Sequence, residues 1–581
     1  MKRIQTIEVV SEFFARNRYL KIGILLVLGA LLLSGAAAVS IKPVLANQEE
    51  PEYLISGRIQ DAQGQPVDEA VVIARLANES EPLAEAVSHE NGNWELLLPT
   101  VPNQPVNIEI SRPHFNTHFL TIGEADLVEV LDSGLWVGVI QLERHISAGF
   151  WIATVVFLAV LLLIAFEVLH STTAALAGFS TIFLVSYIGG AINPGFFIFS
   201  FERGLSYINW EVIFLVMGMM VIIAIIEGTG IFQWMAFQAY RLSLGKSWLL
   251  VLILMLITAV ASALLDNFTT MLLMTPISLQ IALALGINPL ALIIPEVLAS
   301  NVGGISTLVG TPTNILIGAY AGIGFNDFLI NQTLGVIFAL VVMGAFVLYY
   351  YRKEFRKRSG GISPRLYKKL EDNARIERPD SLWKSGVAFG LVLIGFVLGE
   401  RVHLVPAVPA MAGATLLLIW LKPDIHKMIK AVDWTTLVFF MALFIVVGAI
   451  QEVGLISIAA AGMGRLIGQN LPLGIFMVVF GVGTLSTAIA NIPLTASMLP
   501  IVKFLSGSIP GASSNVLYYA LSMGAAMGGN GLLIGGEANL VTAGITQQTS
   551  SPISFKEFLK IGLPVTYLTL GVGFLWLLIR F

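Results

Sequence analysis

Long apolar stretches separated by short polar segments fill the chain from residue 150 to its end. A helix needs about 20 apolar residues to cross a bilayer, and helices are favoured there because they bond every backbone polar group internally. The pattern predicts ten spans, two of them interrupted by glycines: 150–169, 172–190, 210–229, 290–320 (interrupted), 332–351, 383–400, 405–421, 434–452, 515–545 (interrupted) and 560–579.

Two further apolar stretches, 247–285 and 472–507, carry polar residues at their centres. Non-helical backbone cannot face lipid, because its N–H and C=O groups would lack hydrogen-bond partners there. We therefore predict that each stretch is a re-entrant hairpin, in which two helical arms meet at a polar tip.

The two halves of this region match at a nearly constant offset. Trp210 and Trp434 lie 224 residues apart, and so do Asn267 and Asn491 at the two hairpin tips. The segment GGISTLVGTPTN, which starts at Gly303, matches GGNGLLIGGEAN, which starts at Gly528. Each repeat then has five spans and one hairpin. Since five is odd, the second repeat must be inverted relative to the first, which is typical of secondary transporters.

The segment before the spans has a different pattern. Residues 52–143 alternate between apolar and polar positions, and Glu90-Asn91-Gly92 is predicted to be the turn of a β-hairpin. Short strands at this spacing predict a small β-sandwich. The predicted parts are 1–46, a signal peptide or membrane anchor; 47–145, an exported β-sandwich; 146–351, repeat 1; 352–382, a basic cytoplasmic loop; and 383–581, repeat 2.

Charge and composition support this organisation. Charged residues make up 12% of the chain, whereas soluble proteins contain roughly 25%. This low charged fraction excludes a cytosolic enzyme, and the net charge of only -4 excludes a nucleic-acid binder. The stretch from Arg352 to Arg378 holds 10 of the 33 basic residues, which places it in the cytoplasm by the positive-inside rule. The chain has no cysteine, which excludes thiol chemistry.

Polar residues at the hairpin tips and glycine-rich breaks are the candidates for an ion site. Asp266 lies in the middle of an apolar hairpin, where an ionised side chain is costly unless it is paired, hydrated or protonated. Such a carboxylate suits competition between a proton and a cation. The candidate ion- and substrate-binding residues are Asp266, Asn267, Thr269, Thr270, Ser300, Asn301, Gly303, Gly304, Thr311, Asn314, Asn491, Thr495, Gly528, Gly529, Asn530, Glu537 and Asn539.

Glu296, Glu167 and His170 are further candidates, for gating or for a proton relay. Structural interpretations stay open for several of these residues. The glycines could allow close helix packing, Asp266 could be a structural carboxyl, the threonines could cap a helix, and Glu167 could bond His170 locally. No phosphate-binding loop, catalytic motif or metal motif is present, so no cofactor is expected and transport is driven by an ion gradient.

Several segments resemble an ion transporter superfamily. FEVLHSTTAALAG, LLDNFTTMLLMTPI, PEVLASNVGGISTLVGTPTNILI, ANIPLTASMLPI and GGNGLLIGGEANLVTAGI are similar to the superfamily of ArsB arsenite permeases and NhaD sodium/proton antiporters, and most of all to its P-protein and citrate-transporter-like branch. The β region resembles a carboxypeptidase regulatory-like domain. Ala490 stands where NhaD-type chains carry a second aspartate.

The resemblance implies a secondary ion transporter in the plasma membrane, working by alternating access with Na⁺ or H⁺ as the coupling ion. Sodium/proton antiport is the favoured function, because Asp266 is a titratable cation ligand. The alternatives are a permease for arsenite or another small anion (an oxyanion, chloride or a carboxylate) and a transporter-like sensor. The expected partners are the lipid bilayer and a second copy of the chain in a homodimer.

Overall fold

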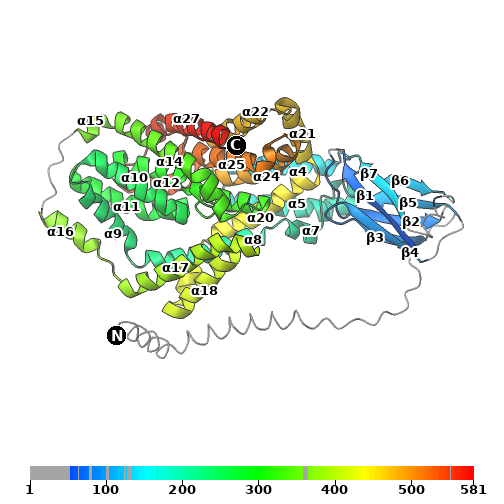
Figure 1. Cartoon of the computed structure of the whole chain (residues 1–581), viewed down its shortest axis with the longest axis horizontal. Coiled ribbons are helices and arrows are strands. Elements are labelled where there is room, and N and C mark those ends of the chain that lie inside the picture. The colour runs from blue at the N-terminus through cyan, green and yellow to red at the C-terminus, as the bar shows by residue number, and fades with distance from the viewer. Residues whose placement is uncertain are drawn as a thin grey trace. The chain divides into compact units, whose positions relative to one another are not determined.

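The computed structural model describes residues 53–62, 64–76, 81–99, 104–123, 126, 134–166, 168–356, 364–549 and 551–581. These residues form two compact units, one made of strands and one made of helices (Figure 1). The predicted signal peptide or anchor, 1–46, lies outside the described residues. The predicted boundaries between the parts of the chain stay predictions.

The first unit is a sandwich of two sheets. One sheet has the strand order β4-β1-β7, with β1 and β7 parallel, and the other has the order β3-β2-β5-β6. The strands are β1 (Tyr53–Asp61), β2 (Val71–Leu76), β3 (Pro82–Val87), β4 (Asn93–Leu98), β5 (Val106–Ser111), β6 (His118–Ile122) and β7 (Leu135–Leu142).

The prediction of a hairpin at Glu90–Gly92 is correct about the turn and wrong about the pairing of the strands. A turn is present, with Gly92 at φ 77° and its N–H donating to the carbonyl of His89 at 2.8 Å. However, β3 pairs with β2 whereas β4 pairs with β1, so the turn connects the two sheets instead of joining paired strands. Local turn chemistry is the same in both cases, which is why the sequence did not distinguish them.

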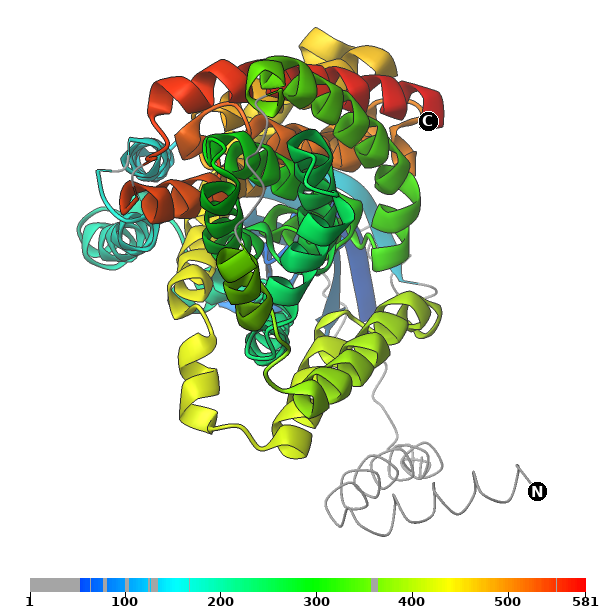
Figure 2. The same cartoon turned by 90° about the vertical axis from the view of Figure 1, so that its left-hand side faces the viewer.

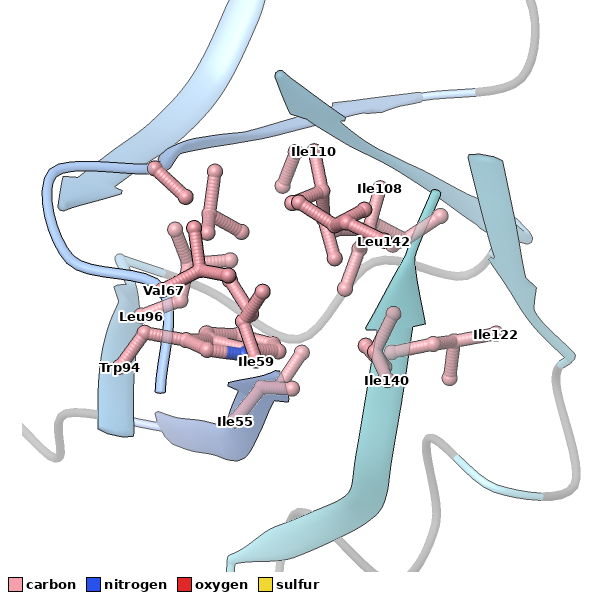
Figure 3. Close-up of a cluster of buried hydrophobic side chains, with 14 of the residues drawn as sticks. Ile55, Ile59, Val67, Trp94, Leu96, Ile108, Ile110, Ile122, Ile140 and Leu142 are labelled. Carbon is pink, nitrogen blue, oxygen red and sulfur yellow. The ribbon is translucent and has the colours of Figure 1, made fainter. Parts of the chain in front are cut away.

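Apolar side chains from both sheets fill the sandwich (Figure 3). Ile59 of β1 and Trp94 of β4 face Ile108 and Ile110 of β5, and all four side chains are completely buried. The inward positions alternate along β1, β4 and β5, as in β4, where Trp94, Leu96 and Leu98 are buried. The strand unit therefore has a hydrophobic core of its own.

The second unit is helical. Its helices are α4 (Ala148–Ala165), α5 (Ser171–Leu184), α6 (Gly190–Ile192), α7 (Phe201–Ser206), α8 (Trp210–Glu227), α9 (Ile231–Leu242), α10 (Ser247–Leu264), α11 (Asn267–Leu285), α12 (Leu290–Gly303), α13 (Pro312–Ala321), α14 (Phe325–Tyr350), α15 (Arg352–Phe355), α16 (Pro364–Asn373), α17 (Pro379–Gly399), α18 (Ala407–Leu421), α19 (Ile425–Ala431), α20 (Trp434–Glu452), α21 (Leu455–Ile467), α22 (Leu471–Phe476), α23 (Gly483–Ser486), α24 (Asn491–Ser508), α25 (Val516–Gly528), α26 (Glu537–Gln547) and α27 (Phe555–Arg580). Figures 1 and 2 show α14 and α27 side by side.

Short segments of other helix types interrupt these helices. Two are π-helical, η1 (Val185–Gly189) and η5 (Met477–Val482). Five are 3₁₀-helical: η2 (Pro194–Phe196), η3 (Gly304–Ser306), η4 (Glu400–Val402), η6 (Ala512–Ser514) and η7 (Leu533–Gly535).

The polytopic helical fold predicted from the apolar pattern is confirmed. Within the described residues, nine helical stretches are long and apolar enough to cross a membrane. The first predicted hairpin consists of α10 and α11, each of which has the length and composition of a full span. The second consists of α22, η5, α23 and α24. The re-entrant course of both hairpins stays a prediction.

Two corresponding glycines of the predicted repeats have the same local structure. Gly230 and Gly454 both precede a helix in the left-handed conformation, at φ 82° and 92°. In addition, α11 of the first half packs against α26 of the second, and α24 packs against α13. The second arm of each predicted hairpin thus lies on a short helix of the other half. The inverted relation of the halves stays a prediction.

Candidate ion-binding site

At the two breaks, neighbouring backbone lies too close for any residue with a side chain. A Cβ on Gly303 would lie 2.4 Å from the carbonyl oxygen of Ala259, and one on Gly528 would lie 2.3 Å from that of Gly483. Both distances are shorter than any normal contact. The first break therefore packs directly against α10, and the second packs directly against α23. Only glycine fits at these two points of contact.

Asn314 and Asn539 close the unwound segments. The side-chain amide of Asn314 donates to the carbonyls of Ile305 at 3.0 Å and Thr307 at 2.8 Å. Asn539 donates in the same way to Gly529 at 2.8 Å and Leu532 at 3.1 Å. The carbonyls released by the breaks are therefore occupied by asparagine amides of the same repeat.

The oxygen of each asparagine accepts a hydrogen bond from the other half. Ser522 Oγ donates to Asn314 Oδ1 at 2.6 Å, and Asn301 Nδ2 donates to Asn539 Oδ1 at 3.0 Å. Asn301 also donates to Asn530 Oδ1 at 2.8 Å and accepts from Asn267 Nδ2 at 2.8 Å. A buried chain of amides thus runs from the first hairpin tip to the second break.

A cavity of about 210 Å³ lies beside this chain of amides, and we call it the central cavity. It contains four carboxylates, from Glu227, Asp266, Asp433 and Glu537. Its other lining residues are Val216, Met219, Met220, Ile223, Ala224, Leu265, Phe268, Thr269, Leu272, Val309, Pro312, Ile315, Ala431 and Thr436. Among the residues that the structure describes, no Lys, Arg or His lines this cavity.

Asp266 and Asp433 have the same local geometry. Asp266 caps α11, and its carboxylate accepts from Thr269 N–H and Thr269 Oγ1, both at 2.7 Å. Asp433 caps α20 and accepts from Thr435 N–H at 3.0 Å and from Thr436 Oγ1 at 2.5 Å. A carboxylate has about four lone-pair sites, so both groups retain acceptor capacity for a ligand.

The remaining two carboxylates differ in exposure. Glu537 is the first residue of α26 and is half-buried, whereas Glu227 is exposed at the last turn of α8. The helix starts at Asp266, Asp433 and Glu537 carry partial positive charge, which stabilises a nearby carboxylate. Carboxylates that share a small cavity repel one another when ionised, so the cavity favours bound cations or bound protons.

Only part of the predicted site lines this cavity. Asp266, Thr269 and Glu537 do. The other predicted ligands lie outside its lining: Asn267, Thr270, Ser300, Asn301, Gly303, Gly304, Thr311, Asn314, Asn491, Thr495, Gly528, Gly529, Asn530 and Asn539, all of them buried.

Several of these buried side chains have hydrogen-bond partners within the same repeat. Thr270 Oγ1 donates to the carbonyl of Asp266 at 2.8 Å, and Thr311 caps α13 by accepting from Asn314 N–H at 3.2 Å. Ser300 Oγ donates to Ser262 Oγ at 3.2 Å. Thr495 is different, because its buried Oγ1 has no hydrogen-bond partner among the described residues.

Sequence reasoning missed Glu227, Asp433 and Thr436. A signal for two of them was present, because Asp266-x-x-Thr269 and Asp433-x-x-Thr436 share one spacing, each at the start of an apolar helix. Glu227 had no comparable signal, since an acidic residue at the end of a span is usually solvated.

The residues predicted for gating or proton relay lie elsewhere. Glu296 is completely buried, its Oε2 accepts from Ser278 Oγ at 2.9 Å, and its Oε1 has no partner among the described residues. His170 is exposed, and its Nδ1 accepts from Thr172 N–H at 3.3 Å. Glu167 lies outside the described residues.

Comparison with known proteins connects this geometry to a family. The family model described as a citrate transporter (CitMHS) matches residues 161–524. A 46 kDa membrane protein of Mycobacterium leprae is 36% identical over 432 residues, which cover 74% of this chain and 98% of that protein. An uncharacterized transporter of Synechocystis is 34% identical over 446 residues, which cover 72% of this chain and 95% of that protein.

The P protein of Homo sapiens is 32% identical over 517 residues, which cover 75% of this chain and 61% of that protein. Among solved structures, the YdaH transporter of Alcanivorax borkumensis aligns with a TM-score of 0.44 and 15% identity, over 74% of this chain and 97% of that one.

Proposed function

Because this chain belongs to the citrate transporter (CitMHS) family and is a membrane transporter rather than an enzyme, we propose that it is a secondary active transporter that exchanges sodium for protons. In this proposal the central cavity alternates between the two faces of the membrane. Asp266, Asp433 and Glu537 are the cation ligands, and Glu227 attracts cations at the cavity's end.

The four carboxylates of the central cavity are the observation that carries this proposal. Carboxylate and hydroxyl oxygens are the ligands that hard cations prefer. A carboxylate must release its proton to bind a cation, so a cation and protons compete for one site. Competition of this kind couples the entry of one ion to the exit of the other.

A small anion is the second candidate substrate, and two observations favour it. The matching family is described as a citrate transporter, and three helix starts point their partial positive charge at the cavity. Against this, the four carboxylates would repel an anion, and among the described residues no basic side chain lines the cavity to offset them. We therefore place the anion second.

The test is ion exchange by the purified full-length protein in proteoliposomes. Sodium, lithium or potassium is added outside while the internal pH is recorded, with Asp266→Asn as the variant. Asparagine caps a helix as well as aspartate does, so this change removes the charge and retains the cap. We expect the apparent sodium affinity to fall about tenfold or more, because the variant loses a charged ligand. A factor of ten in affinity corresponds to about 1.4 kcal/mol.

Asp380→Asn is the matched control, because Asp380 carries the same charge on the exposed first turn of α17. Its exchange should equal that of the unmodified protein. Absence of any cation response in folded protein, together with uptake of labelled citrate or arsenite, would replace the antiport proposal with the anion one.

A further inference from the structure

A second cavity, of about 370 Å³, lies in the helical unit and is not part of the site described above. We call it the outer cavity. It is lined by the first two turns of α8, Leu308, α13 from Ile315 onward, the turn after it, the start of α14, Phe396 near the end of α17 and the segment between α17 and α18. Its titratable side chains are Glu211, Asp327, Glu400 and His403.

The two cavities lie end to end along the same helices. On α8, Glu211 and Leu215 line the outer cavity, whereas positions from Val216 to Glu227 line the central cavity. An α-helix of 18 residues is about 27 Å long, close to the thickness of the hydrocarbon core. Together the cavities therefore extend along nearly the whole length of one span.

Only a thin apolar layer separates them. Ile315 of α13 lines both cavities. Leu215 lines the outer cavity and the next residue, Val216, lines the central cavity. Leu308 and Val309 are divided between the cavities in the same way. Leu215 and Leu308 are 2% exposed and Ile315 is 5% exposed. We call Leu215, Leu308 and Ile315 the septum.

On the far side of the septum, two of the outer cavity's carboxylates are held by hydrogen bonds. Asn326 donates its backbone N–H and its side-chain amide to the two oxygens of Glu400, both at 2.8 Å. Gly324 N–H donates to Asp327 Oδ2 at 3.3 Å. The contacts of Asn326 join the start of α14 to η4, directly after α17. The three carboxylates of the outer cavity suit a hydrated cation.

We propose that the outer cavity is the second half of the ion pathway, open to the membrane face opposite the mouth of the central cavity, and that the septum is the barrier between them. This inference rests on the proposed transport of a cation. An ion cannot enter a narrow apolar constriction without losing water that nothing there replaces. The septum thus prevents leakage while the central carboxylates are loaded from the other side.

Sidedness is tested by cysteine labelling, because the native chain contains no cysteine. Ala224 lines the central cavity, Ala319 lines the outer cavity, and Ala299 is buried in α12 and lines neither. Each is changed to cysteine in the full-length protein. A charged, membrane-impermeant thiol reagent is then applied to right-side-out and to inverted membrane vesicles.

We expect Ala224→Cys to react at its highest initial rate from one face and Ala319→Cys from the opposite face, with Ala299→Cys unreactive from both. Reaction of Ala224→Cys and Ala319→Cys from the same face would overturn the inference. This labelling needs no transport activity, so it can succeed or fail whether or not the protein exchanges sodium for protons.

The barrier itself is tested by Ile315→Ala. Ile317→Ala is the matched control, because Ile317 lies on the same helix, is completely buried and lines neither cavity. In proteoliposomes without a pH gradient, Ile315→Ala should raise the passive sodium leak about tenfold, equivalent to about 1.4 kcal/mol of barrier. An equal leak in both folded variants would show that Ile315 is not the barrier, and Leu308→Ala provides an independent substitution if Ile315→Ala does not fold.

Discussion

At the scale of single residues, the polar groups of this protein fall into two sets with different environments. Asn267, Asn301, Asn314 and Asn539 are buried and bond one another or the unwound backbone. The carboxylates of Asp266 and Glu537 are only half-buried and face the central cavity. The amides therefore hold the breaks in place, whereas the carboxylates are available to a ligand.

Asn314 and Ser522 should be energetically coupled. Asn314→Ala leaves buried carbonyls without a donor, and each such group costs about 1–3 kcal/mol. We expect Asn314→Ala to lower the midpoint of thermal unfolding in detergent, and Ser522→Ala to lower it less. The double variant should be less destabilised than the sum of the two, because both changes remove one shared bond. Additive shifts would contradict this.

The sequence identified the polar residues of the core but could not separate ligands from structural groups. Asp266 and Glu537 are ionisable residues among apolar neighbours, so their positions alone indicated a site. Asparagine can serve equally as a ligand or as a bridge, and only the positions of the carbonyls of Ile305, Thr307 and Leu532 decide between these roles.

At the scale of elements, contact between helices depends on two glycines. Gly303 and Gly528 touch backbone of neighbouring helices, so a methyl group at either position must displace a helix. We expect Gly303→Ala and Gly528→Ala to destabilise the protein by about 1–3 kcal/mol, as overpacking does elsewhere. The measurement is the thermal unfolding midpoint, together with the yield of folded protein from the membrane.

Gly386→Ala is the control for this prediction. Gly386 lies within α17, and a Cβ there meets no atom within 4 Å. Alanine is the better helix former by about 0.8–1.0 kcal/mol, so this variant should be unchanged or slightly more stable. Equal losses in all three variants would mean that close packing is not the reason for the glycines.

The positions of helices and strands were predicted well where the thickness of a bilayer sets the length of a helix. They were predicted less well where contacts between distant residues determine the pairing of strands. The span predicted at 434–452 coincides with α20, because about 20 apolar residues are required for any span. Turn residues at Asn91 and Gly92 predicted a turn correctly but not its partners, since the pairing of β3 and β4 depends on residues far away in the chain.

At the scale of the whole molecule, the strand unit has a core that is complete within itself. We expect the segment 47–145 to fold when produced alone. Trp94→Ala should then destabilise it by about 3–5 kcal/mol, because Trp94 is completely buried. Trp136→Ala should change stability by no more than about 0.5 kcal/mol, because Trp136 is 57% exposed. Urea unfolding followed by circular dichroism measures both, and equal effects would contradict the described core.

The family and the fold class could be predicted from the sequence because hydropathy and the internal repeat act over hundreds of residues. The homodimer and the transported ion remain predictions, since both depend on surfaces and distances that no motif of this chain encodes. Asp433 is an example. Asp433 and Glu537 belong to the second half of the chain, and they meet Asp266 of the first half only when the two halves pack together.

The bond between Ser522 and Asn314 also has a consequence for biosynthesis. The two residues are 208 positions apart, and a ribosome adding about 5–20 residues per second needs on the order of 10–40 s to cover that interval. Until Ser522 has been synthesised, the oxygen of Asn314 lacks this donor. The nascent transporter therefore passes through a stage in which the polar core of its first half is incomplete.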